Sequence, residues 1–93
     1  MSSKRFTKVW DAIEDTPAEV ENMKLRSALI MALKEWIISK SLSQRQAAKF
    51  FGITQPRISD LLRGKINLFS LDTLVSMATA AGLNVELLIM ETA

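Results

Sequence analysis

The chain has 93 residues, of which 48% are hydrophobic, and it contains no cysteine, histidine or tyrosine. This length suits one domain over residues 1–93, and the hydrophobic content is too high for a disordered chain. The absence of cysteine excludes a disulfide framework. The absence of histidine removes the most common acid–base side chain and metal ligand. We therefore expect no enzyme, no metal site, no cofactor and no small-molecule substrate.

Hydropathy along the chain gives no sign of a membrane protein. No apolar run approaches the ~20 residues that a membrane span needs. The basic start of the chain lacks the apolar stretch that follows in a signal peptide. We expect a cytoplasmic protein that does not contact a membrane.

The net charge of +2 hides an uneven distribution. Residues 1–39 carry six basic and six acidic side chains, and residues 66–93 carry three acidic side chains and no basic one. The basic residues between them, opposed only by Asp60, are Lys40, Arg45, Lys49, Arg57, Arg63 and Lys65. Such a basic block is typical of a surface that binds a polyanion, although a solvated face without a partner has the same composition.

The first forty residues predict a short helix followed by a long one. In the N-terminal segment 1–15, apolar residues at helical spacing form a short stripe, Phe6, Val9, Trp10 and Ile13. A capping box with proline at the first helical position, from Thr16 to Glu19, then begins a long helix over residues 16–40. The face that we expect this helix to bury comprises Leu25, Leu29, Leu33, Trp36 and Ile37, with Ala28 and Ala32 beside it.

Two short helices follow over residues 43–64. Ser43 begins a second capping box, and Gly52 can take the left-handed conformation that ends a helix. Thr54 caps the next helix, in which Pro56 lies in the first turn, where a missing amide costs little, and Gly64 ends it. Two helices joined by such a tight glycine turn predict a helix-turn-helix.

The last third predicts a helix and a strand. Ser70 caps a helix over residues 70–82, and the β-branched, apolar run 84–90 suits a strand. No second strand is evident, and a lone strand leaves its backbone groups unpaired. We therefore expect the strand to pair with a second copy of the chain, with Val85, Leu87 and Ile89 on the face that packs in the dimer.

The polar residues of the second short helix predict what it binds. The N-terminal end of a recognition helix enters the major groove of DNA, so its first turn lies closest to the bases. Gln55 can pair with adenine and Arg57 with guanine through two hydrogen bonds each. Ser59 and Asp60 are the other polar residues expected to face outward. An ordinary helical hairpin with solvated polar residues is the alternative.

The stretch from Leu42 to Lys65, LSQRQAAKFFGITQPRISDLLRGK, resembles the Cro and λ-repressor-like helix-turn-helix family of XRE type. The flanking sequences are similar to antitoxins of type II toxin–antitoxin modules, those that resemble the host-inhibition-of-growth antitoxins. The resemblance implies an all-α bundle of about five helices that dimerises, here with a short C-terminal β-strand. It implies base contacts by Gln55, Arg57, Ser59 and Asp60. It implies phosphate contacts by Gln44 and by the region from Arg63 to Lys65, and we add Arg45 and Thr54 from the starts of the two helices.

One departure from the family concerns Pro56, which stands where several members carry a polar side chain that reads a base. We expect a homodimeric, sequence-specific repressor that binds a palindromic operator in double-stranded DNA and regulates its own operon, as antitoxins do. The alternative is a protein-interaction module that mainly neutralises a toxin, a small ribonuclease. In that case the stripe in residues 1–15 is an anchor for the toxin, whereas otherwise it covers the core.

Overall fold

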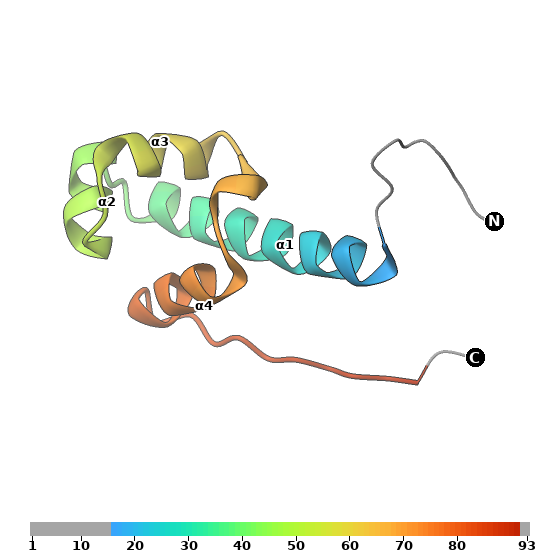
Figure 1. The fold of residues 1–93 in the computed structure, drawn as a ribbon. Helices are drawn as coiled ribbons and strands as arrows, with labels where there is room; N and C mark the ends of the chain where they lie inside the picture. Colours follow the sequence, from blue (N-terminus) through green and yellow to red (C-terminus); the bar gives the residue numbers. More distant parts are fainter. Residues whose placement is uncertain (1–15, 92–93) are drawn as a thin grey trace.

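The computed structural model of the protein describes residues 16–91. These residues form four α-helices and one short 3-10 helix (Figure 1). Their bounds are α1 Pro17–Ser39, α2 Gln44–Phe51, α3 Gln55–Leu62, η2 Ile66–Leu68 and α4 Leu71–Ala80. The sequence predicts about five helices, and the described residues contain four α-helices. The stripe from Phe6 to Ile13 lies outside the described residues.

The helix starts are set by local hydrogen bonds. At α1 the Glu19 amide donates to the Thr16 hydroxyl over 3.1 Å, and the Thr16 amide donates to the Glu19 carboxylate over 3.4 Å. Ser43 and Gln46 make the same reciprocal pair at α2. Thr54 and Ser70 accept from the third amide of α3 and α4. All four caps occur where the sequence predicts them, because capping is decided within four residues.

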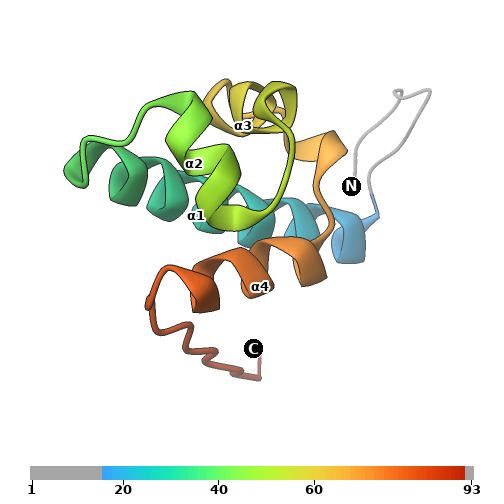
Figure 2. The same cartoon turned by 90° about the vertical axis from the view of Figure 1, so that its left-hand side faces the viewer.

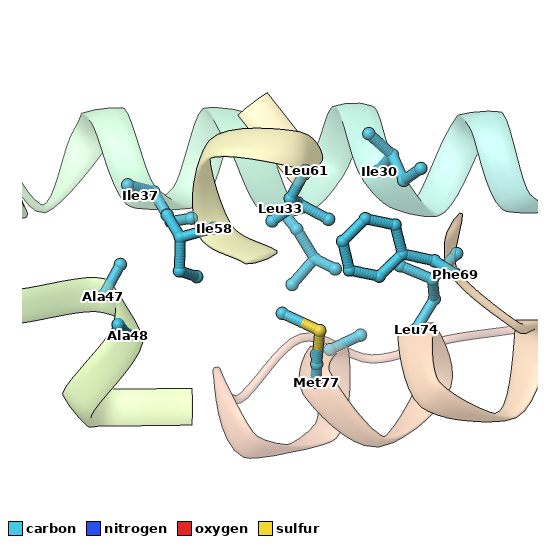
Figure 3. Close-up of a cluster of buried hydrophobic side chains, with 11 residues drawn as sticks. Ile30, Leu33, Ile37, Ala47, Ala48, Ile58, Leu61, Phe69, Leu74 and Met77 are labelled. Atoms are coloured by element: carbon cyan, nitrogen blue, oxygen red, sulfur yellow. The ribbon is translucent and has the colours of Figure 1, made fainter. Parts of the chain in front are cut away.

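Helix α1 is the central element. Helix α3 packs on one side of it and α4 on the other, while α2 crosses the end of α3 (Figures 1 and 2). The core lies between these helices, and its largest fully buried side chains are Leu33, Ile37, Ile58, Leu61, Phe69 and Leu74 (Figure 3). Residues from every α-helix thus contribute to one buried cluster.

The buried face of α1 differs from the expected one. Ile30, Leu33 and Ile37 are buried, whereas Leu25 is 41% exposed and Leu29 is only partly buried. Helix α1 carries apolar residues around much of its circumference, and the buried ones are those that lie between it and helices α3 and α4. The expected face was wrong in part, because sequence periodicity cannot choose between two apolar sides of one helix.

The strand expected over residues 84–90 is not present in this chain. After α4 the chain runs as an extended segment without helix or sheet assignment up to Glu91 (Figure 1). No other part of residues 16–91 is extended beside it, so its amides and carbonyls find no ladder partner. The predicted strand is therefore corrected to an unpaired extended segment.

Candidate nucleic-acid interface

The turn between α2 and α3 fixes how the two helices meet. Gly52 has φ of +70°, and its amide and that of Ile53 both reach back to the carbonyl of Ala48. Ala47 and Ala48 are buried, and their small side chains allow α2 to lie close to the rest of the bundle. These contacts hold α3 across α2 in the arrangement of a helix-turn-helix (Figure 2).

The side chains of α3 divide into a buried and an outward set. Ile58 and Leu61 are fully buried and attach the helix to the core. Gln55, in the first turn, is exposed and makes no side-chain hydrogen bond within the described residues. Ser59 is only partly exposed. Of the four residues predicted to contact bases, Gln55 is thus the one that is exposed and has no side-chain hydrogen bond among the described residues.

Asp60 and Arg63, predicted to contact a base and a phosphate, bind each other. The Arg63 guanidinium donates to the Asp60 carboxylate over 3.1 Å. The Asp60 side chain is 19% exposed and that of Arg63 is 59% exposed. An exposed pair of this kind adds little stability, but it offsets the charge of Arg63.

Arg57, predicted to contact guanine, is held by the segment that follows α3. Its guanidinium donates to the carbonyl of Leu68 over 2.9 Å. The same group lies 4.8 Å from the centre of the Phe69 ring, a cation–π contact. Its side chain therefore points toward η2 in this structure, although the residue as a whole is exposed.

A second arginine, which sequence reasoning missed, reaches the same segment from α1. Arg26 donates to the carbonyls of Ile66 and Phe69 over 3.1 and 3.4 Å. It is partly buried, and its Nε has no hydrogen-bond partner among the described residues. Its spacing offered a signal, because Arg26 precedes Ile30 and Leu33 by four and seven residues and so shares their face of the helix.

The remaining residues predicted to contact phosphate lie at helix ends. Gln44 and Arg45 are exposed in the first turn of α2. The Thr54 hydroxyl accepts from the Arg57 amide over 3.3 Å and therefore serves as the N-cap of α3. Lys65 is exposed directly after α3, and within residues 16–91 it forms no ion pair.

The third predicted set, the dimer residues, lies away from this surface. Val85, Leu87 and Ile89 are 45%, 67% and 82% exposed on the extended C-terminal segment.

Within residues 16–91 there is no cluster of side chains that could hold a metal ion. No helix in the described part of the chain is long and apolar enough to cross a membrane.

Comparison with known proteins agrees with this geometry. Residues 12–90 match the model of a family described as "Helix-turn-helix domain". A solved structure named "Putative XRE Family Transcriptional Regulator" is 32% identical, with a TM-score of 0.72 over 80% of this chain and 83% of that chain. No curated protein matches. The chain therefore belongs to this helix-turn-helix family and is a DNA-binding transcriptional regulator of XRE type.

Proposed function

We propose that the protein is a repressor that binds a palindromic operator as a homodimer and regulates its own operon from the cytoplasm. The observation that carries the proposal is the exposed first turn of α3 within the basic block over residues 40–65. In that turn Gln55 makes no side-chain hydrogen bond to any residue that the structure describes. A bound dimer excludes RNA polymerase from an overlapping promoter. Gln44, Arg45, Thr54, Arg63 and Lys65 are the proposed phosphate contacts, and Gln55, Ser59 and Asp60 are proposed base contacts.

Selection of bound sequences from random duplexes tests base reading. The parent chain should enrich one palindrome, and Gln55→Ala should lose ~1–3 kcal/mol on it and relax discrimination at one position in each half-site. Asn22→Ala, which removes an exposed amide from α1, is the control and should leave the enriched sequence unchanged. Enrichment of no sequence by the parent chain would contradict the repressor proposal.

The proposed dimer interface is an apolar groove of about 460 Å³ between α1, α4 and the C-terminal segment. Leu25, Ala28, Leu29 and Ala32 line it from α1, and Leu71 and Val75 line it from α4. Leu25 and Leu29 belong to the face of α1 that the sequence predicts to be buried, and Ala28 and Ala32 lie beside them. A second copy of the chain would cover this groove.

The C-terminal segment supplies a matching apolar surface on the same molecule. Leu83 and Val85 form one wall of the groove, while Leu88 and Met90 are 81% and 72% exposed. A groove and an exposed apolar segment in one chain suit a two-fold interface, in which each copy gives its segment to the other. The unpaired backbone of residues 84–90 would then form an antiparallel ladder with its twin.

Truncation and a groove variant test the dimer. A chain ending at Asn84 keeps Leu83, whose amide bonds to the Ala78 carbonyl, and should sediment as a monomer. That chain should lose ~10²-fold or more in affinity for the palindrome, because the two half-sites no longer act together. Leu29→Glu in the groove should have the same effect, whereas Met31→Glu, exposed on α1 outside it, should remain dimeric. A dimeric truncated chain would exclude the C-terminal segment from the interface.

The antitoxin role rests on the sequence resemblance and on the apolar stripe within residues 1–15 of the sequence. If a toxin is encoded beside this chain, co-expression and pull-down should recover the two proteins together. A chain starting at Thr16 should lose the partner if the stripe in residues 1–15 anchors it. Equal capture of the partner by the full and the shortened chain would assign the stripe to core packing. If neither chain captures the product of the neighbouring gene, and expression of that product alone is harmless, the protein is a repressor without a toxin.

A further inference from the structure

The connection between α3 and α4, residues 63–70, is held by side chains from two helices. Arg26 of α1 donates to the carbonyls of Ile66 and Phe69, and Arg57 of α3 donates to the carbonyl of Leu68. The connection has only one turn of 3-10 helix, and no side-chain cap precedes η2. The two guanidinium groups therefore supply donors that secondary structure does not.

Arginine suits this role better than other side chains. Its planar group carries five N–H donors, so a single Arg26 can reach two carbonyls and Arg57 can bond to one while stacking on an aromatic ring. Phe69, the ring beneath Arg57, is only 1% exposed and therefore fixed in the core. Neither arginine forms an ion pair with a carboxylate of residues 16–91.

The connection includes Lys65, an exposed cation just beyond α3. Lys65 has its amide on the Asp60 carbonyl and accepts from the Leu68 amide, so its backbone moves with the held segment. Arg63 is already paired with Asp60, which leaves Lys65 as the unpaired cation at this end of α3 among the described residues. A cation whose backbone is already fixed loses less freedom when it binds a phosphate.

We propose that Arg26 and Arg57 form a clamp that positions Lys65 against the DNA backbone, with Arg57 a positioning residue and not a reader of bases. The inference rests on the proposed function and deepens it. It assigns a DNA-binding role to Arg26, which lies on a helix outside the helix-turn-helix. It also opposes the sequence prediction that Arg57 reads a guanine. The positioning role and the base-reading role predict different binding results for the same variants.

The first experiment compares Arg26→Met with Lys24→Met on operator DNA. Both variants remove one positive charge from α1 and keep an unbranched stem, but Lys24 is exposed and, within residues 16–91, pairs only with Glu21. Arg26→Met should bind ~10-fold more weakly, and the slope of log affinity against log salt should fall by about one, which is also the fall expected for Lys65→Ala. Lys24→Met should match the parent chain. Equal binding by both variants would overturn the clamp.

Double variants separate positioning from general loss of stability. If Arg26 acts through Lys65, the variant with both Arg26→Met and Lys65→Ala should bind no more weakly than Lys65→Ala alone. Multiplied losses would contradict the inference. Binding is measured below the thermal transition of the least stable variant. The affinity of Arg26→Lys, which keeps the charge but loses the planar fork of donors, should fall between those of the parent chain and Arg26→Met.

Selection of random duplexes with Arg57→Ala decides the role of Arg57. A positioning residue leaves the preferred base at every position unchanged while affinity falls on all duplexes alike. Relaxed discrimination at one position would assign Arg57 to base reading and overturn that half of the clamp. If the parent chain binds no duplex at all, the proposed function itself fails, whereas a binding parent with insensitive variants refutes the clamp alone.

Discussion

The helix-turn-helix and the C-terminal segment use similar apolar residues with opposite outcomes. In residues 43–64, Ile58 and Leu61 are fully buried, while in residues 83–91, Leu87 and Ile89 are largely exposed. The first region folds back on α1 and α4 within one chain, whereas the second has neither a helix nor a second strand to cover it. The difference shows that the available partner, and not the hydrophobicity of a residue, decides whether it belongs to the core.

The largest expected effect tests this comparison directly with one substitution in each region. Leu61→Ala should lower the free energy of unfolding by ~2–5 kcal/mol, because it leaves a cavity among fully buried side chains. Leu87→Ala, at low concentration where the chain is monomeric, should change it by less than about 0.5 kcal/mol. Urea unfolding at micromolar and lower concentrations measures both. A large loss for Leu87→Ala in the monomer would break the comparison.

A smaller effect is expected at the backbone of the helix-turn-helix. Gly52 has φ of +70°, and a Cβ added there would meet no atom within 4 Å. Gly52→Ala should therefore lower the free energy of unfolding by ~1–2 kcal/mol, through the left-handed conformation alone. Gly52→Asn should lower it less, since asparagine tolerates this region. Thermal unfolding measures the difference, and an equal loss for the two variants would point to packing instead.

The smallest effect has the opposite sign. Ser41, in the corner between α1 and α2, has φ of +55° without being glycine. Ser41→Gly should raise the free energy of unfolding by up to ~1 kcal/mol, because glycine has no Cβ and adopts a positive φ without steric cost. Calorimetry at one protein concentration can detect such a shift. A lower stability would mean that the greater freedom of glycine in the unfolded chain outweighs the relief.

What the sequence predicts well is local. The caps at Thr16, Ser43, Thr54 and Ser70, and the left-handed Gly52, depend on residues within four positions of each other. The positions of α1 to α4 follow from them to within about two residues. The resemblance to an XRE-type regulator uses the same local pattern, and the family match agrees with it.

What the sequence did not reveal depends on contacts between distant residues. Arg26 meets the Ile66 carbonyl across 40 positions, and Arg57 meets the Leu68 carbonyl across 11. No period of hydrophobicity marks such pairs, so the sequence predicts a role for Arg57 only from its place in α3 and does not pair Arg26 with the connection. The strand was misassigned for a related reason, because its ladder needs a partner that residues 16–91 do not contain.

The shortness of α2 and α3 makes the recognition surface inseparable from the whole domain. Each helix has eight residues, fewer than the ~12–15 that an isolated helix needs in water. Ala47 and Ile58 share one buried cluster with Leu33 of α1 and Leu74 of α4. A peptide cut from residues 42–65 would thus lack a DNA-reading shape. The helix-turn-helix therefore cannot be transferred alone to another protein, and a graft of its outward residues must include α1 and α4 as well.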